Sequence, residues 1–327
     1  MSEIPSVVSP IPVDPVAHAQ LPVTALHEAQ RPATGRLNLD HVAHFVADRE
    51  AAAAALERLG FTLTPFSEQS HRTEVGGPLV PAGSGNRCAM LREGYLEFLS
   101  PIAETPIAEQ LRASIRRYTG VHLIAYGSAD ADADHARLER HGFDPLPPVA
   151  LQRQARTATD STTTVRFTVT RTAPGTMPEG RIQFCCHHTP EGVWQLRWLE
   201  HANRAAALRR VFVAVDDPVE AAGRYGRYSG IAAEAVAGAA GCEFAQSTSR
   251  GTLHLMDGVA LRARLGIDAP TLPWIAGYEL ASDDLSITRA VLDASGTSVH
   301  ALDDARLRVD LPPELGGVIV FVPLSSG

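Results

Sequence analysis

Short motifs that identify several enzyme classes are missing from this sequence. It contains no G-x-S-x-G nucleophile elbow, no dinucleotide-binding fingerprint, no phosphate loop ending in G-K-S or G-K-T, and no H-E-x-x-H pair. The glycine-rich stretch PAGSGNRCAML does not open a helix, and we interpret it as a tight turn that leads into a strand. Any chemistry must therefore come from residues that the fold brings together.

The sequence also lacks features that would indicate a nucleic-acid partner, an oxidising compartment or a membrane segment. The 29 basic residues are dispersed and are outnumbered by 37 acidic ones, so the formal net charge is −8 and no basic run typical of nucleic-acid binding is present. The four cysteines show no C-x-x-C spacing, which fits a reducing cytoplasm. Neither an apolar run of about 18 residues nor a secretory signal is found. We expect a cytoplasmic protein with no membrane segment and no nucleic-acid partner.

Proline is concentrated near the N-terminus, at positions 5, 10, 12, 15, 22 and 32. This density forbids a continuous helix or a central strand. We predict that residues 1–36 form a Pro-rich arm that is flexible or docked on the surface; the alternative is an arm that covers a pocket or a partner subunit. The remaining chain has globular composition, and a length of 327 residues suits two domains.

A short segment recurs along the chain. DREAAAAALERLGF (48–61) returns as DADADHARLERHGF (130–143), and fainter copies begin at Asp217 and Asp284. In each copy an Asp precedes apolar residues at helical spacing, and a Gly follows them. Asp is suited to cap a helix and Gly to end one. The pattern predicts four helices.

Strand-like runs surround each predicted helix. Residues 39–46, 121–127, 211–215 and 275–281 precede the helices, and about three β-rich stretches follow each one, including FTLTPF after the first helix and a short piece near Phe143 after the second. This order predicts an α+β fold of four βαβββ units. Two units would pair into a cupped mixed sheet with the helices outside. We expect domains at 37–190 and 208–327, joined by an ordered connector at 191–207.

Four residues could hold a divalent metal in the first domain. His41 lies in the first strand, Glu97 in the last strand of unit one, His122 in the first strand of unit two, and Gln183 in the strand that matches YLEFL. Two imidazoles and a carboxylate suit Fe, Mn, Ni or Zn, with Gln183 as a weaker fourth ligand. The alternative is that both histidines are core residues and that Glu97 pairs with an arginine.

The register of the second unit decides whether His122 can join this set. Aligning the two clearest helices places Leu123, and not His122, opposite His41. An extra residue would have to be absorbed, for example by a bulge near Gly127. Otherwise a slip of one residue turns His122 to the wrong face.

The four units, with LDHVAHFV before its capped helix, GYLEFL and GVHLIAYG, resemble the vicinal-oxygen-chelate superfamily, and within it the glyoxalase-like domain proteins, over roughly residues 37–323. The resemblance implies metal ligands from the first and last strands of paired units, which by position are His41, Glu97, His122 and Gln183. It also implies catalytic roles for Glu97 and Gln183. The last ligand is usually Glu in that superfamily, so Gln183 lowers the charge of the site.

Further polar residues are candidates for contacting substrate. Asn86 and Arg87 lie at the turn before the last strand of unit one, where Arg87 could clamp a carboxylate or pair with a surface acid. His187 and His201 lie in FCCHHTPEGVWQLRWLEH, the densest cluster of ligand-type residues. We expect the tryptophans of that segment to pack between domains, with a stacking platform as the alternative.

The second half provides an internal comparison. Aligning the units places Arg210 at the position of His41 and His254 at that of Glu97, a pair that does not chelate a cation. We therefore predict one metal per chain, in residues 37–190, and a degenerate site in residues 208–327.

The resulting functional hypothesis is a metal-dependent lyase or isomerase that acts on a small oxygen-rich molecule chelated through vicinal oxygens. Two alternatives stay open: a ferrous extradiol-type dioxygenase, and a protein that binds a small molecule without turnover, like the antibiotic-resistance members of the superfamily. The expected partners are the small-molecule substrate and, as an open alternative, a second copy of the chain.

Overall fold

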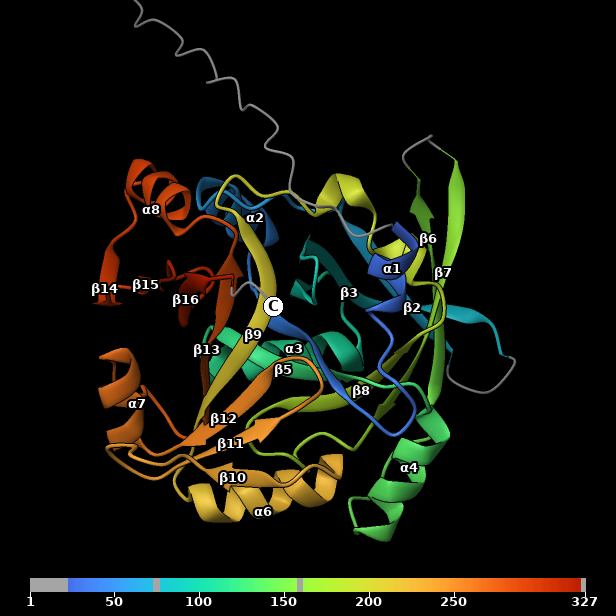
Figure 1. Cartoon of the computed structure of the whole chain (residues 1–327). Helices are drawn as coiled ribbons and strands as arrows, with labels where there is room; N and C mark the ends of the chain where they lie inside the picture. Colours follow the sequence, from blue (N-terminus) through green and yellow to red (C-terminus); the bar gives the residue numbers. More distant parts are fainter. Residues whose placement is uncertain (1–22, 73–76, 158–160, 325–327) are drawn as a thin grey trace, which may run out of the picture.

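A computed structural model describes residues 23–72, 77–157 and 161–324 (Figure 1). Within these ranges the order strand, helix, three strands occurs four times, as the sequence predicts. The fold is α+β, with a mixed sheet and helices packed on it. The first 22 residues of the predicted arm lie outside the described part of the chain. Among the described residues, no helix is both long and apolar enough to cross a membrane.

The first two units supply ten elements. Unit one contains β1 (Asn38–Phe45), α2 (Arg49–Arg58), β2 (Ser67–Arg72), β3 (Leu79–Met90) and β4 (Tyr95–Pro101). Unit two contains β5 (Gly120–Gly127), α4 (Ala131–Arg140), β6 (Val149–Arg156), β7 (Thr162–Arg171) and β8 (Arg181–His187).

The last two units repeat this order. Unit three contains β9 (Ala205–Ala214), α6 (Pro218–Ser229), β10 (Ala233–Ala235), β11 (Glu243–Ser247) and β12 (Thr252–Met256). Unit four contains β13 (Trp274–Ser282), α8 (Leu285–Ala294), β14 (Val299–Asp303), β15 (Arg306–Asp310) and β16 (Val318–Pro323). Five further helical elements lie between or before the units: α1 (Val23–Glu28), α3 (Pro106–Arg117), α5 (Pro190–Val193), the 3-10 helix η1 (Leu196–Trp198) and α7 (Gly258–Leu265).

The helix starts are those predicted from the repeat. Asp48, Asp130, Asp217 and Asp284 each accept hydrogen bonds from backbone N–H groups in the first helical turn. A glycine with positive φ follows each helix, as at Gly60, where φ is 85°. Local chemistry therefore defines both ends of the four main helices.

Strand pairing joins the units in the same way in both halves. In the first half, β1 runs parallel to β4 and antiparallel to β5, and β5 runs parallel to β8. In the second half, β9 and β13 take the places of β1 and β5. A short β5–β13 pairing links the two eight-stranded parts. In Figure 1, α2 and α8 lie together at one end of the molecule, and α4 and α6 at the other.

Three strand positions differ from the sequence prediction. The stretch PAGSGNR (81–87), predicted as a tight turn, lies within β3. The segment FTLTPF (61–66) is not part of a sheet, and the strand that follows α2 is β2, at Ser67–Arg72. The polar groups of Thr62 bond instead to His201 and to the carbonyl oxygen of Glu200, so no ladder forms there. The strand expected near Phe143 is likewise displaced to β6.

Helix α3 was not predicted, and it covers one end of the cup in the first half. Its Leu111 is fully buried against Leu99 and Leu123, residues of β4 and β5 that face the cup. Ile107 at the start of the same helix lines the cavity described below. The helix therefore closes one end of the cup with apolar side chains.

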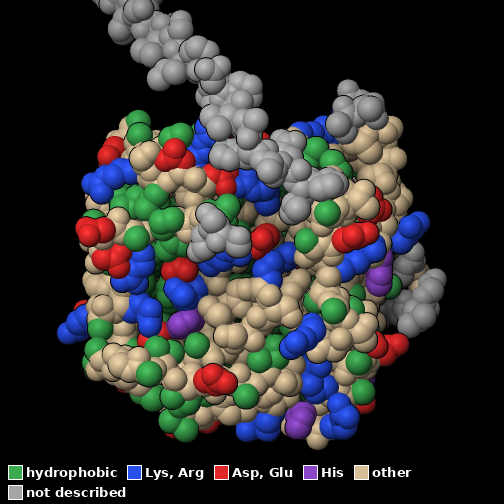
Figure 2. All heavy atoms as spheres, in the orientation of Figure 1, with side chains coloured by type: hydrophobic (Ala, Val, Ile, Leu, Met, Phe, Trp, Pro, Cys, Tyr) green, Lys and Arg blue, Asp and Glu red, His purple; other side chains and the backbone are tan. Residues whose placement is uncertain are grey.

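The surface carries no single-sign region on the face seen in Figure 2, where acidic and basic side chains are interspersed.

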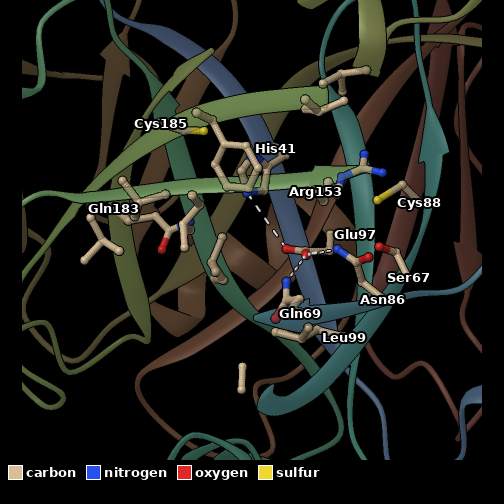
Figure 3. A pocket seen from close by; sticks show the side chains of 18 of the residues that line it. His41, Ser67, Gln69, Asn86, Cys88, Glu97, Leu99, Arg153, Gln183 and Cys185 are labelled. Atoms are coloured by element: carbon tan, nitrogen blue, oxygen red, sulfur yellow. Dashed lines mark hydrogen bonds and ion pairs between the residues drawn. The ribbon is translucent and has the colours of Figure 1, made fainter. Parts of the chain in front are cut away.

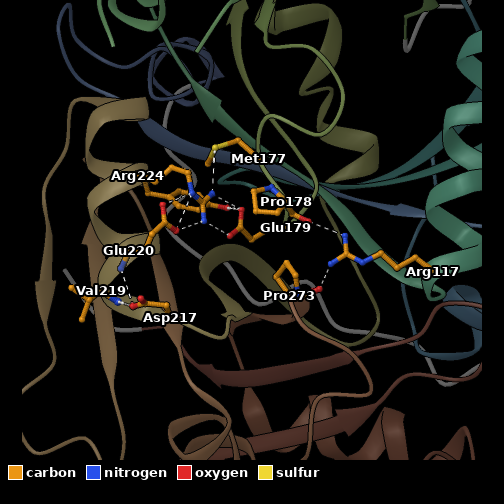
Figure 4. A network of polar contacts seen from close by, with 10 residues as sticks. Arg117, Met177, Pro178, Glu179, Asp217, Val219, Glu220, Arg224 and Pro273 are labelled. Atoms are coloured by element: carbon orange, nitrogen blue, oxygen red, sulfur yellow. Dashed lines mark hydrogen bonds and ion pairs between the residues drawn. The ribbon is translucent and has the colours of Figure 1, made fainter. Parts of the chain in front are cut away.

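The two halves meet through a buried ion pair (Figure 4). Arg224 of α6 donates to both carboxylate oxygens of Glu179, which precedes β8, at 2.8 and 2.9 Å. Glu179 is 1% exposed, whereas Glu220, the second acidic partner of Arg224, is 53% exposed.

We predict that Glu179→Ala lowers the free energy of unfolding by about 3–5 kcal/mol, because it leaves the largely buried guanidinium of Arg224 without its buried partner. Glu220→Ala is the matched control, and its exposed pair should contribute about 0–1 kcal/mol. Urea unfolding followed by circular dichroism measures both. Equal effects of the two variants would contradict the assignment of the buried pair.

Candidate functional site

A cavity opens in the cup of the first half (Figure 3). All of its lining residues lie between His41 and Val193. One wall is apolar and includes Met90, Leu99, Leu123, Val165 and Phe167. The polar lining includes ligand-type and hydrogen-bonding side chains, among them His41, Ser67, Gln69, Asn86, Glu97, Arg153, Arg171, Arg181, Gln183, Cys185 and His187.

His41 is held by its neighbour in the sequence, Asp40. Successive side chains of a regular strand point to opposite faces. Here Leu39 pairs with Tyr126 and His41 with Ala125, so Asp40 is an extra residue that bulges from β1. Nδ1 of His41 donates to Oδ2 of Asp40 at 2.7 Å, since a carboxylate only accepts. Nε2 of His41 is therefore left as the free nitrogen.

Glu97 faces that nitrogen. Its Oε2 lies 3.9 Å from Nε2 of His41. Its Oε1 accepts hydrogen bonds from the amides of Asn86 at 2.5 Å and Gln69 at 3.4 Å, as Figure 3 shows. Asn86, predicted as a substrate-binding residue, lines the cavity and holds Glu97 in place. Two amide donors fix the orientation of the carboxylate.

Asp40 also bonds to His187, which lines the cavity as predicted. Nε2 of His187 lies 3.1 Å from Oδ2 of Asp40 and 3.5 Å from Sγ of Cys185. Burial alone would raise the pKa of Asp40, but the charges and hydrogen bonds of His187 and His41 hold it well below its usual range. One donor atom from each of Asp40, Cys185 and His187 lies within 4.8 Å of the other two, so these residues form a second group that could hold a metal.

His122 does not reach the cavity. Ala43 pairs with Leu123 and His44 with Val121, so His122 is the extra residue of a bulge in β5. Its Nε2 donates to the carbonyl oxygen of Tyr118 at 2.7 Å. Leu123 occupies the cavity wall instead. The bulge exists, but it lies at His122 and not near Gly127, so it does not bring the imidazole beside His41.

Two predicted substrate contacts also lie elsewhere. Arg87 donates to the carbonyl oxygen of Thr64 and pairs with Glu57, so its alternative role as a surface ion pair is the one observed. It neighbours Asn86 in β3, and the strand period turns it away from the cavity. The ring of His201 bonds to the backbone of Thr62 and Met90 and does not line the cavity. Gln183, in contrast, lines the cavity and is buried.

Several polar residues of the cavity region were not predicted from the sequence, among them Asp40, Arg171 and Arg181. The strand period of two places Asp40 on the face opposite His41, and only the bulge reverses this. Arg171 and Arg181 both line the cavity. Arg181 precedes Gln183 by two residues, so the same alternation that selected Gln183 would have found it.

Cysteine chemistry is disfavoured in this cavity. Burial raises the pKa of the Cys88 thiol to about 12 and the pKa of the Cys185 thiol well above its ordinary value. Nearby carboxylates, including Glu97, act in the same direction. Since the thiolate is the nucleophile, neither residue is poised for covalent catalysis.

The second half fills the corresponding space with paired charges and apolar groups. The strand register places Arg210 at the position of His41 and His254 at that of Glu97, as predicted. Arg210 donates to His254 at 2.9 Å and to Glu279 at 2.6 Å. His254 also bonds to Glu243 at 2.5 Å. These groups satisfy one another and leave no free set of ligands like that of the first half.

A family model described as a glyoxalase-like domain matches residues 39–229, more than half of the chain. A comparison with curated proteins gave no match. A hypothetical protein from Staphylococcus aureus is similar in structure, with a TM-score of 0.58, 11% identity, and coverage of 88% of this chain and 100% of that one.

Two other solved structures share the fold. A triple mutant of 4-hydroxymandelate synthase from Streptomyces coelicolor has a TM-score of 0.53 and 14% identity, covering 89% of this chain and 94% of that one. A fusion of a xylose isomerase-like TIM barrel with a 4-hydroxyphenylpyruvate dioxygenase has a TM-score of 0.53 and 12% identity, covering 91% of this chain and 51% of that one. At these identities the similarity concerns the fold alone.

Three buried histidines predict acid sensitivity. Burial lowers the pKa of His44, His122 and His201 from 6.5 to about 4. The unfolded chain binds protons at these histidines more tightly than the folded chain does. The free energy of unfolding is therefore highest above pH 6.5 and decreases as the pH falls toward 4. Each histidine accounts for about 3 kcal/mol of this decrease in the free energy of unfolding. We expect cooperative acid unfolding in this window, followed by circular dichroism.

The contribution of His122 can be isolated. His122→Gln should reduce the loss of stability between about pH 7 and pH 5, because one of the three groups no longer titrates. His141→Gln, in an exposed position after α4, is the control and should leave that loss unchanged. An unaltered pH dependence in His122→Gln would contradict the assignment of a neutral structural histidine.

Proposed function

We propose that this chain, which belongs to the glyoxalase-like domain family of the vicinal-oxygen-chelate superfamily, is a metal-dependent enzyme of lyase or isomerase type that acts on a small oxygen-rich molecule. One observation carries the proposal. A buried imidazole, oriented by a buried carboxylate, presents its free nitrogen to Glu97 at 3.9 Å inside a cavity. Such a pair is suited to hold a metal and to move protons.

The residues present fit a divalent metal. A histidine ligand commonly donates its other ring N–H to a carboxylate, and His41 does so to Asp40. Glu97 keeps Oε2 on the side of His41 while Asn86 and Gln69 bind Oε1. Gln183 lines the same cavity and adds an amide oxygen. We assign His41, Glu97 and Gln183 as the ligands, with Fe, Mn, Ni or Zn as candidate metals.

A metal bound there would polarise two neighbouring substrate oxygens as a Lewis acid. The chain's own residues would supply the proton chemistry. Oε2 of Glu97, the oxygen that the amides leave free, would accept a proton from a carbon next to a substrate carbonyl when it is not engaged with a metal, and would return that proton to the product. The side-chain amide of Gln183 would donate to a substrate oxygen. The apolar wall formed by Leu99, Leu123 and Phe167 would limit the access of water.

Other reaction classes have less support from the cavity. Its lining contains no lysine for a Schiff base, and its cysteines are held as neutral thiols. A ferrous dioxygenase of the two-histidine, one-carboxylate type would need a second free imidazole beside His41. His122 does not supply it, and His187, which bonds to Asp40 through Nε2 and keeps Nδ1 without a partner among the described residues, is the imidazole that this alternative would require. A binding protein without turnover would not need the Asp40–His41–Glu97 arrangement.

We predict that His41→Ala and Glu97→Gln each reduce bound metal at least roughly tenfold, because each removes a ligand. Metal content is measured by elemental analysis of protein purified without chelators. His122→Gln is the matched control, since its imidazole lies outside the cavity, and it should keep its metal. Loss of metal in His122→Gln would overturn the ligand assignment.

Cys185→Ser separates the two possible metal positions. We expect this variant to retain metal, because Cys185 is not among the proposed ligands. If Cys185→Ser loses metal while Glu97→Gln keeps it, the metal is held by Asp40, Cys185 and His187 instead. Visible spectra of the Co²⁺-substituted protein give a second readout, since thiolate coordination produces an intense charge-transfer band.

We further propose that residues 37–190 carry the metal site and that residues 208–327 form a half with a degenerate site. His254→Ala should leave metal content at the wild-type value of one per chain. Two metals per chain, or loss of metal in this variant, would show that the second half takes part.

A further inference from the structure

Two guanidinium groups face the cavity without partners. Arg171 and Arg181 both line it. Within residues 23–72, 77–157 and 161–324, neither side chain has a hydrogen-bond or ion-pair partner, and Nε of Arg171 is buried and unsatisfied. Both side chains are partly buried, where a charged group without a partner is disfavoured, and a guanidinium cannot lose its charge at neutral pH. Two such groups side by side are suited to bind an anion.

The sheet register brings both groups to one place. Arg171 of β7 is the direct cross-strand neighbour of Gln183 in β8. Arg181 precedes Gln183 by two residues in β8, so its side chain lies on the same face. The guanidinium of Arg181 also lies over the ring of Phe45, 5.5 Å from its centroid, which helps to orient it. Gln183 therefore has an arginine on each of two sides.

The electrostatics support this interpretation. Arg171 and Arg181 carry charges of the same sign and act on each other across the cavity wall. Glu97 acts the other way, but its carboxylate is bonded to Asn86 and Gln69. The two cations thus repel each other, and the acid of the cavity is engaged elsewhere. A bound anion would reduce the repulsion between the two arginines and give each guanidinium an acceptor.

The second half shows that the fold does not require these arginines. The register places Val318 at the position of Arg181 and Val320 at that of Gln183. Arg308 takes the position of Arg171, but it pairs with Asp310 and donates to the carbonyl oxygen of Leu265. Where no ligand is expected, the same site is apolar or internally neutralised.

We propose that the substrate is a small acid whose carboxylate is received by Arg171 and Arg181, with Gln183 between them and the reacting oxygens toward His41 and Glu97. This inference rests on the proposed function, because it takes the same cavity as the active site. Planar guanidinium groups match the two oxygens of a carboxylate. Arg87, the predicted carboxylate clamp, lies outside the cavity, and these two residues take over the role.

The probe for this site is propionate, compared with propionamide, which has the same shape and no charge. Titration calorimetry at constant ionic strength should show binding of propionate and none of propionamide. Arg171→Gln and Arg181→Gln should each weaken propionate roughly ten- to a hundredfold, because each removes charge-assisted hydrogen bonds. Arg87→Gln, the matched control outside the cavity, should bind as the wild type does.

Two further variants separate this inference from the metal assignment. His41→Ala and Glu97→Gln should still bind propionate even where metal is lost, since the clamp does not include them. Arg181→Lys, which keeps the charge, should recover part of the affinity and shows that a loss in Arg181→Gln is not misfolding. Absence of propionate binding in the wild type, equal weakening in Arg87→Gln, or loss in His41→Ala alone would overturn the proposal.

Discussion

The antiparallel pairing of β1 with β5 is the constraint on which the candidate site depends. It joins the first two units into one sheet, and β4 and β8 then flank these strands on either side. Glu97 and Gln183 reach one cavity for that reason. Each central strand carries one extra residue, Asp40 in β1 and His122 in β5. The first bulge turns a carboxylate toward His41, and the second leaves an imidazole outside the cavity.

The two halves share the backbone arrangement and differ in what fills the cup. In the second half, apolar residues and mutually paired charges occupy the positions of the first half's polar side chains. In the first half, Glu97 and the guanidinium groups face open space. Because the same backbone arrangement occurs with either filling, the fold does not require the polar set of the first half. Its presence is best explained by a ligand.

Local sequence patterns were sufficient for the architecture. An Asp that caps and a Gly that ends a helix act through bonds within one or two turns, so the four helices could be located from the chain alone. The period of two identified the strands of Glu97 and Gln183, and both residues line the cavity. Helix α3 escaped prediction because it is stabilised by Leu111 packing into the cup, which is a contact between distant segments.

The sequence by itself thus determined the four βαβββ units, their capped helices and the strands that carry His41, Glu97 and Gln183. Only the tertiary structure decided which neighbours join them. A β-bulge depends on how one strand pairs with another, and a shift of one residue exchanges the two faces. For that reason Asp40 bonds to His41, while His122 bonds to the backbone outside the cavity.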